Sequence, residues 1–237
     1  MRTPRRPAPI AGSAFVGFCF PPDVIVLAVR WYLRFALSYR DVEELLAERG
    51  IQVDHVTIYR WVVRFTPLLA EAARPCRHVV GDRWWVDETH VKVAGRWRYV
   101  YRAVDQAGQV IDAFVFPRRD AGAARRFFEQ ALGAATRTPV EVVTDQAATY
   151  PVVLEELLPM AWHRTDRYAN NRIEADHGLL KAWLRPMCGL KQDRSARVVI
   201  AGHDFVQNLR RGHYELAVEQ PAARRVAVAF DELALAI

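Results

Sequence analysis

The chain has 237 residues, of which 51% are hydrophobic and 25% are charged, and its formal net charge is +6. This composition excludes an intrinsically disordered chain, because the apolar side chains suffice to bury a core. The most apolar run, Val24 to Val29, is far too short to span a membrane. The positive charge favours a polyanionic partner, although the 30 Arg against 3 Lys also fit a general replacement of Lys by Arg.

The first part of the chain carries no signal for export. Residues 1–20 are rich in Pro and Gly, so we expect an irregular N-terminus. Its Arg-rich start is followed by Pro7 and Pro9 rather than by an apolar run, so no secretory signal is expected. The cysteines match neither a disulfide framework nor a zinc site, and a reducing cytoplasm is the simplest inference; they are Cys19, Cys76 and Cys188.

Residues 21–74 are predicted to form a helix-turn-helix domain. A first helix runs from Asp23 to about Leu37 and begins at a Pro-Pro pair, which suits a helix N-terminus. The two helices of the motif are predicted at Tyr39–Arg49 and His55–Phe65, the second continuing or kinking at Pro67. The signals that bound them are Ser38 with Asp41 as a capping box, Gly50 as a stop, and Asp54 as the next cap.

The second helix of this motif suggests a surface for reading DNA. In DNA-binding proteins with this motif, the second helix enters the major groove by its N-terminal residues. The alternative is an ordinary helical hairpin, in which Tyr59 and Trp61 only pack. The candidate DNA contacts are His55, Thr57, Tyr59, Arg60 and Arg64, on the face opposite Val56, Ile58 and Val62.

A linker over residues 75–82 precedes a second domain, predicted over residues 83–215. Three strands joined by two turns are expected between Arg83 and Phe116. The later elements are a helix at Ala121–Ala135, a strand at Val140–Thr144, a helix at about Tyr150–Leu158, a strand at Ala161–Arg164, a helix that contains Ile173 to Leu184 and is stopped by Pro186, and a helix at roughly Arg194–Arg211. The C-terminal tail, residues 216–237, contains a short amphipathic helix.

The predicted order from residue 83 is β-β-β-α-β-α-β-α, which is the order of the ribonuclease-H-like fold. The fold class is therefore α/β, a ribonuclease-H-like mixed sheet preceded by an all-α helix-turn-helix domain. Right-handed crossovers in this fold place the fourth strand beside the first. Asp87 and Asp145 can then approach each other although they are far apart in sequence.

Asp87 is unusual because it falls within a predicted strand. One interpretation is an aspartate on an edge strand that faces water; the other is a metal ligand. Glu174, at the start of a later helix, is a candidate third acid beside Asp87 and Asp145. Carboxylates this close repel one another unless cations neutralise them, and hard oxygen ligands select Mg²⁺ or Mn²⁺. Two such ions act together on a phosphodiester, so a two-ion site is expected.

Three segments carry a resemblance to a known family. VDETHVKVAGRWRYVYRAVD, TDQAATY and NNRIEADHGLLK resemble DDE-class bacterial insertion-sequence transposases, and the insertion-sequence-six family matches best. The resemblance implies that Asp87, Asp145 and Glu174 are the catalytic and metal-binding residues. It also implies binding to the terminal inverted repeats of an element, DNA cleavage that frees a 3′-hydroxyl, strand transfer into target DNA with cointegrate products, a homo-oligomer, and action at the bacterial nucleoid.

The sequence departs from this family at one informative position. Gln146 stands where members commonly have a basic residue after the second Asp, and the spacing from Asp145 to Glu174 is short. A second interpretation therefore stays open: a catalytically impaired, domesticated DNA-binding protein derived from a transposase. A host nuclease of the same fold is disfavoured by the helix-turn-helix.

Other polar residues are predicted to support the site or the DNA. Glu88 is expected at the surface, because neighbours in a strand point to opposite faces, and Asp105 is expected to cap a turn. The possible supporting residues are Asn171 and His177, and further candidate DNA contacts are Lys181, Arg194 and Arg197.

Overall fold

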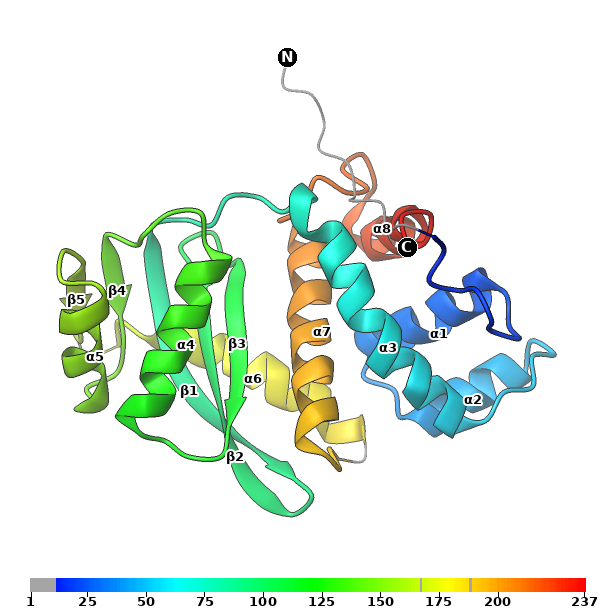
Figure 1. The fold of residues 1–237 in the computed structure, drawn as a ribbon, viewed down its shortest axis with the longest axis horizontal. Coiled ribbons are helices and arrows are strands. Elements are labelled where there is room, and N and C mark those ends of the chain that lie inside the picture. The colour runs from blue at the N-terminus through cyan, green and yellow to red at the C-terminus, as the bar shows by residue number, and fades with distance from the viewer. Residues whose placement is uncertain (1–11, 167, 188) are drawn as a thin grey trace. The chain divides into compact units, whose positions relative to one another are not determined.

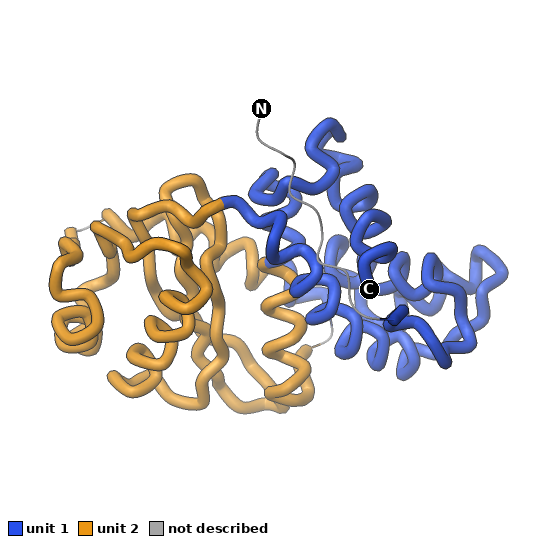
Figure 2. The backbone as a smooth tube through the Cα atoms, turned by 45° about the horizontal axis from the view of Figure 1, so that its top comes forward, with its two compact units in different colours: residues 1–78, 183–188, 205–237 blue, residues 79–182, 189–204 orange. Residues whose placement is uncertain are grey.

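The computed structural model describes residues 12–166, 168–187 and 189–237 (Figure 1). The predictions for the first 11 residues and for Cys188 lie outside this range. The described chain forms two compact units (Figure 2). Unit 1 takes its residues from 1–78, 183–188 and 205–237, and unit 2 takes them from 79–182 and 189–204. This division follows packing alone, so the predicted functional domains stay a prediction.

Unit 1 is built from helices. Its elements are α1 (Pro22–Phe35), α2 (Tyr39–Ala47), α3 (His55–Ala73), the 3₁₀ turn η1 (Arg74–Cys76) and α8 (Ala222–Ala234). Helix α8 contacts both α1 and α3. Residues 12–20 have no regular secondary structure, but the Phe15 ring stacks on Phe65 at 4.8 Å and the Phe20 ring meets Trp61 edge-on at 5.1 Å. Aromatic packing therefore ties this irregular segment to α3.

The predicted capping signals of α2 and α3 are confirmed. The Ser38 hydroxyl accepts from the Asp41 amide and the Asp41 carboxylate accepts from the Ser38 amide, which completes the capping box. The Asp54 carboxylate accepts from the first amides of α3, at 2.9 and 3.0 Å. Gly50 adopts a φ of +73°, the left-handed conformation that favours glycine after a helix. Helix α3 continues through Pro67, which is exposed, to Ala73.

Unit 2 contains a five-stranded mixed sheet. Its strands are β1 (Arg83–Val93), β2 (Arg96–Asp105), β3 (Val110–Phe116), β4 (Glu141–Val143) and β5 (Trp162–Arg164). Its helical elements are α4 (Ala121–Ala134), α5 (Thr149–Leu157), most of α6 (Asn171–Leu184) and the first part of α7 (Asp193–Arg211). The ends of α6 and α7 are assigned to unit 1, as is the 3₁₀ turn η2 (Arg185–Met187) that follows α6.

The strand order is β3-β2-β1-β4-β5, which confirms the ribonuclease-H-like fold class. The first three strands pair antiparallel, and β4 pairs parallel with both β1 and β5. The predicted placement of the fourth strand beside the first is therefore correct. It makes β1 the central strand of the sheet.

Both faces of β1 are covered. On one face, Trp84 and Val86 belong to a core cluster with Phe127 and Phe128 of α4 and Tyr150 of α5. On the other face, Trp85 packs against a small cluster that includes Ile173 of α6. Because side chains alternate along a strand, Asp87 faces the α6 side and Glu88 faces the side of α4 and α5.

A buried ion group holds α6 and α7 against the sheet. Arg102 of β2 is 0% exposed, and its guanidinium pairs with Asp176 of α6 at 2.7 Å and with Asp204 of α7 at 2.5 Å. Burial raises the pKa of Asp204 to about 7, and the Arg102 charge opposes that rise. Arg102 lies directly opposite Asp87 across the β1–β2 pair. The group therefore locates α6 beside the strand position that carries Asp87.

Along the described residues, no helix combines the length and the apolar content needed to cross a membrane.

Replacement of Arg102 by Met should destabilise the chain by about 3–5 kcal/mol, because two buried carboxylates would lose their cation. Urea unfolding followed by circular dichroism measures this loss. The matched control is Arg98→Met, which breaks an arginine–carboxylate pair with Asp193 whose acid is 47% exposed and should cost about 1 kcal/mol or less. Equal losses in the two variants would contradict the structural role of Arg102.

Candidate active site

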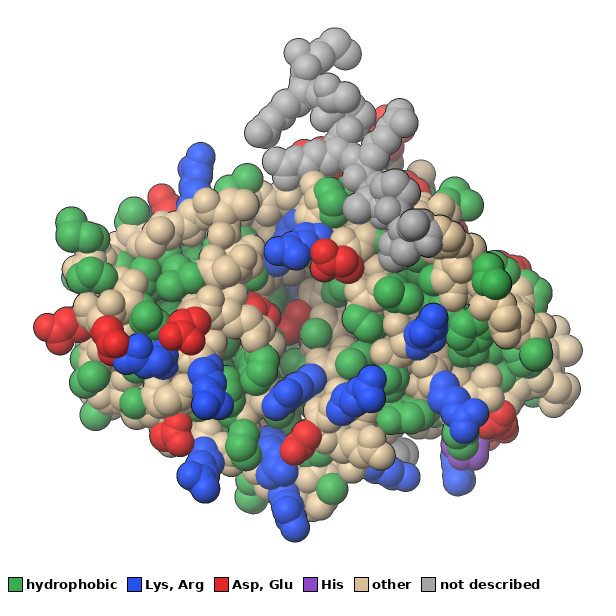
Figure 3. All heavy atoms as spheres, viewed as in Figure 1, with side chains coloured by type: hydrophobic (Ala, Val, Ile, Leu, Met, Phe, Trp, Pro, Cys, Tyr) green, Lys and Arg blue, Asp and Glu red, His purple; other side chains and the backbone are tan. Residues whose placement is uncertain are grey.

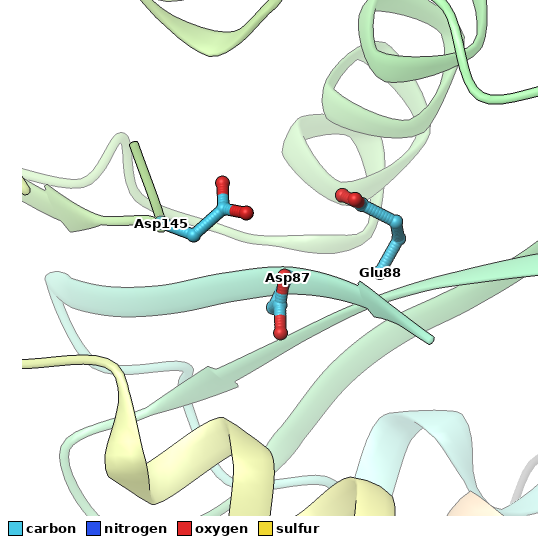
Figure 4. Close-up of side chains that lie close together, drawn as sticks. All are labelled: Asp87, Glu88 and Asp145. Atoms are coloured by element: carbon cyan, nitrogen blue, oxygen red, sulfur yellow. The ribbon is translucent and has the colours of Figure 1, made fainter. Parts of the chain in front are cut away.

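Three carboxylates meet beside the central strand. Asp87 and Glu88 are consecutive residues of β1, and Asp145 follows the end of β4. The parallel register pairs Trp85 with Val143, so the residues two positions further along each strand, Asp87 and Asp145, arrive at the same level of the sheet. One oxygen from each of the three acids lies within 4.8 Å of the others, and the Glu88 and Asp145 carboxylates point toward each other (Figure 4).

The prediction that Glu88 is a surface residue is wrong. Its side chain is only 5% exposed. The Tyr150 hydroxyl donates to one of its oxygens, and the Arg119 guanidinium pairs with the other. The strand alternation was read correctly, but the face opposite Asp87 is covered by α4 and α5 rather than by water. The central position of β1 was the signal for this, because a central strand can have both faces buried.

The electrostatics of the three acids suit a divalent cation. Burial, with the charges of Glu88 and Asp145 in addition, raises the pKa of Asp87 to about 7. Burial also raises the pKa of Glu88, while the hydrogen bond from Tyr150 and the Arg119 charge act against that rise. The described residues thus present hard oxygen donors whose negative charge is incompletely compensated, which is the donor set that Mg²⁺ and Mn²⁺ prefer.

Arg119 supplies the nearest cation to the acids. It lies in the loop between β3 and α4, and its Nη2 is 3.3 Å from Asp145 Oδ2 while its Nε pairs with Glu88. Its side chain is 43% exposed, so part of its hydrogen-bonding edge faces solvent. Sequence reasoning did not select Arg119 or Tyr150. No local pattern distinguishes Arg119 from its neighbour Arg118, because its role depends on a contact with a different strand.

Helix α6 approaches the acids from the other face of β1. His177 is buried, and its Nδ1 is 3.6 Å from Asp87 Oδ2, slightly beyond hydrogen-bonding distance. Burial, followed by the Arg102 charge, lowers the pKa of His177 to about 3, so the imidazole is neutral at pH 7. Among the described residues, His177 Nε2 has no hydrogen-bond partner.

Glu174 is exposed and lies in the first turn of α6. It precedes His177 by three residues, which places both side chains on the same helical face. It is not part of the three-acid group found among the described residues, which consists of Asp87, Glu88 and Asp145. The structure therefore brings two of the three predicted acids together and presents the third from the neighbouring helix.

Most of the polar residues that flank these acids form hydrogen bonds with backbone groups. Asp105 caps its turn as predicted, because its carboxylate accepts from the amides of Ala107 and Gln109. Asn171 is the first residue of α6 and is exposed, whereas the Asn170 carbonyl accepts from the Glu174 amide. Gln146 is exposed, and its side chain donates to the Thr165 carbonyl at 3.4 Å.

The candidate DNA contacts on α3 differ in accessibility. His55 pairs with Glu43 of α2 at 3.0 Å, and the Thr57 hydroxyl donates to the Asp54 cap at 2.7 Å. Tyr59 meets the Tyr39 ring edge-on at 5.6 Å, and the Arg64 guanidinium lies 5.7 Å from the Phe18 ring centroid. Arg60 is exposed. The placement of Val56 on the packed face was wrong, because this residue is 44% exposed at the open start of α3.

The remaining candidate DNA contacts are exposed and lie in unit 2. Lys181 is on α6, whereas Arg194 and Arg197 are on α7. The Arg197 guanidinium lies 4.9 Å from the centroid of the Phe114 ring, which holds its charge at the surface. These exposed positions are compatible with contacts to DNA phosphate.

Comparison with known proteins gives a consistent picture. A family model described as a DDE domain matches residues 81–213. The transposase for insertion sequence-like element IS431mec of Staphylococcus aureus strain Mu50 is 38% identical over 167 residues, covering 68% of this chain and 74% of the relative. The transposase for insertion sequence element IS257 in transposon Tn4003 of Staphylococcus aureus shows the same identity and coverage.

Among solved structures, the HTLV-2 integrase catalytic core domain in complex with magnesium, in its trimeric form, is similar with a TM-score of 0.43 and 18% identity. The match covers 56% of this chain and 88% of the HTLV-2 integrase core chain.

Asp87→Asn should stabilise the metal-free protein at high pH. The folded-state pKa of Asp87, about 7, exceeds the ordinary value of 3.8, so the folded state binds the extra proton and the wild type loses stability as pH rises from about 4 to about 7. In EDTA at pH 8 we expect a gain of up to about 4 kcal/mol, or roughly 8–16 °C in melting temperature. The gain should vanish near pH 4.

In the same melting experiment, Mn²⁺ should raise the melting temperature of the wild type at pH 8 and should leave the Asp87→Asn, Asp145→Asn double variant unchanged. An equal Mn²⁺ response in the two proteins would show that these acids do not bind the ion.

Arg119→Gln should bind Mn²⁺ about tenfold more tightly than the wild type, because a positive charge beside Glu88 and Asp145 opposes the approach of a cation. Isothermal titration calorimetry measures the affinity. The control is Arg125→Gln, which removes the same charge from an arginine of α4 that pairs with Glu156. If both variants bind Mn²⁺ as the wild type does, Arg119 has no influence on the ion.

Proposed function

Because the chain belongs to the DDE-class insertion-sequence transposases, in the insertion-sequence-six family, we propose that it binds the terminal inverted repeats of its element and catalyses metal-dependent DNA cleavage and strand transfer. In the first step, water attacks the phosphodiester at the end of the element and a 3′-hydroxyl leaves. In the second step, that 3′-hydroxyl attacks a phosphodiester of target DNA, and a 3′-oxygen of the target leaves. Cointegrates are the expected products.

The single observation that carries this proposal is the meeting of Asp87 and Asp145 at one level of the sheet within a matched DDE domain. We propose that these two acids and Glu174 form the catalytic, metal-binding triad, with Mg²⁺ or Mn²⁺ as the ion. Bound ions of this kind activate the attacking oxygen and stabilise the leaving one. Glu174 lies on the α6 face that also carries His177, whose ring is next to Asp87, and this placement supports Glu174 as the third acid.

The neighbouring residues have distinct parts in this proposal. Tyr150 and Arg119 hold Glu88 in place, and Glu88 in turn positions the Arg119 guanidinium beside Asp145. The exposed edge of Arg119 can donate to a phosphate oxygen of the DNA strand, since a guanidinium has five N–H groups. Arg119 thereby offers a cation where Gln146, next to Asp145, cannot. His177 stays neutral and adds no positive charge that would oppose the metal.

Recognition of the terminal repeats is assigned to α3. Arg60 and Arg64 are the exposed residues among the predicted contacts on α3, while His55 and Thr57 also serve the structure of the motif. Lys181, Arg194 and Arg197 are proposed to contact the DNA backbone near the chemistry. Because strand transfer joins two element ends to one target, we propose a homo-oligomer as the active form.

Three substitutions test the triad: Asp87→Asn, Asp145→Asn and Glu174→Gln. Each should lower cointegrate formation by at least about a hundredfold in a two-plasmid mobility assay, because loss of a metal-holding acid costs several kcal/mol of transition-state stabilisation. The control is Glu155→Gln, which removes an exposed acid from α5. Normal mobility of all three triad variants would refute the assignment.

An assay with purified protein and end oligonucleotides addresses the second candidate, an impaired DNA-binding protein, which the exposed Gln146 beside Asp145 favours. A wild-type chain that binds the inverted repeats but gives no Mn²⁺-dependent joining of end oligonucleotides would establish that alternative. Detectable joining would exclude it.

A further inference from the structure

The end of the β1–β2 hairpin forms a rigid projection of unit 2. Ala94 and Gly95 make its two-residue loop with φ values of +48° and +77°. Positive φ at both loop positions gives the turn that matches the twist of the two strands. A Cβ on Gly95 would meet nothing within 4 Å, so the backbone conformation, rather than lack of space, favours glycine there. Figure 1 shows the hairpin extending beyond the rest of the sheet.

This hairpin is fastened to the segment that leads into α7. The Ala94 amide donates to the Leu190 carbonyl at 2.7 Å, and Val93 forms a bridge with Leu190. Arg98 binds both oxygens of Asp193, at 2.9 and 3.0 Å. Two segments separated by more than 90 residues in the chain are thereby joined into one surface.

The joined surface is strongly basic. Residues 92–98 and 190–197 together carry a net charge of +5, and their only acid is Asp193, which Arg98 already neutralises. The pKa of Asp193 is lowered first by the Arg98 hydrogen bond and further by the charges of Arg197 and Arg96, which shows that these arginines gather around it. The cations of the surface are Lys92, Arg96, Arg98, Lys191, Arg194 and Arg197, and Figure 3 shows Lys and Arg side chains at the edge where the hairpin ends.

An exposed aromatic ring accompanies these charges. Trp97 is 53% exposed, although a tryptophan is usually buried. The Lys92 ammonium lies 4.9 Å from the Trp97 ring centroid, and the His90 ring meets it edge-on at 4.9 Å. The ring therefore holds the Lys92 charge at the tip, on the face of the hairpin opposite Arg96 and Arg98. An ordinary solvated surface mixes both signs of charge, whereas this one concentrates a single sign, which self-repulsion disfavours unless a polyanion compensates it.

We propose that residues 92–98 and 190–197 form a track for the phosphate backbone of duplex DNA beside the acids. The inference rests on the proposed function and extends the predicted contacts at Arg194 and Arg197 to Arg96 and Lys191. Arg96 pairs with Val93, which is six residues beyond Asp87 on β1, a distance of about 20 Å at roughly 3.3 Å per residue.

The test compares two double variants of the full chain that remove equal charge. Arg96→Gln, Lys191→Gln takes two cations from the track. Arg126→Gln, Arg137→Gln takes two exposed cations from α4 and the loop after it. Binding of a fluorescein-labelled 30-base-pair duplex is followed by anisotropy in Ca²⁺ over a range of salt concentrations. Each phosphate contact contributes about 0.9 to the slope of log affinity against log salt.

For the track variant, the slope of log affinity against log salt should be smaller in magnitude by about 1.8, and its affinity near 0.1 M salt should be at least roughly tenfold lower. The control should keep the wild-type slope. The charge-conserving variant Arg96→Lys, Lys191→Arg should restore the wild-type slope, which separates lost charge from lost folding. Equal slopes for the track and control variants would overturn the inference, and the hairpin would then serve another partner. Failure of the proposed function would be seen in a different experiment. The wild type would then give no Mn²⁺-dependent joining of end oligonucleotides, whatever the salt dependence of its DNA binding.

Discussion

The parallel pairing of β1 with β4 is the constraint on which the candidate site depends. Strand β4 has only three residues, yet it is covered on both sides by β1 and β5 and is fully buried. Its register sets Trp85 opposite Val143, and Asp87 and Asp145 follow at the same level because each lies two residues further on. A shift of one residue would carry Asp145 away from Asp87. The chemistry of the site therefore rests on the burial of a short apolar strand.

A second constraint acts from the opposite side of β1. The Arg102 guanidinium binds one acid from α6 and one from α7, so the two helices share a buried anchor in the sheet. A buried arginine with two carboxylates is costly to desolvate, and its value lies in geometry more than in net stability. Here the geometry is functional: α6 carries both His177, which faces Asp87, and Glu174 one turn earlier.

Charge is divided sharply within unit 2. The three acids gather negative charge in a partly buried position, which one loop arginine, Arg119, compensates only in part. The hairpin end and the start of α7 gather positive charge at the surface. Under the proposed function the two charges are complementary: the acids would hold a cation at the reacting phosphodiester, and the basic surface would offset the repulsion between those acids and the rest of the DNA backbone.

The sequence by itself determined the order of the elements and the positions of two acids, Asp87 within a strand and Asp145 just after one. Several features depend only on residues that are close in sequence, and the structure contains them as predicted. They are the alternation around Asp87, the apolar run before Asp145, and the caps Ser38 and Asp54. The order of the strands in the sheet could also be predicted from the order of the elements, because right-handed crossovers allow few topologies. The family resemblance rested on the same contiguous segments and was confirmed by the DDE domain match.

Only the tertiary structure decided what surrounds those acids. Glu88 was read as a surface residue because alternation tells which face a side chain takes, but not whether a helix covers that face. Tyr150 and Arg119 reach Glu88 from distant parts of the chain, and no sequence period encodes such contacts. The same reason applies to Val56, which is exposed at the start of α3, and to α8, which packs with α1 and α3 from the other end of the chain.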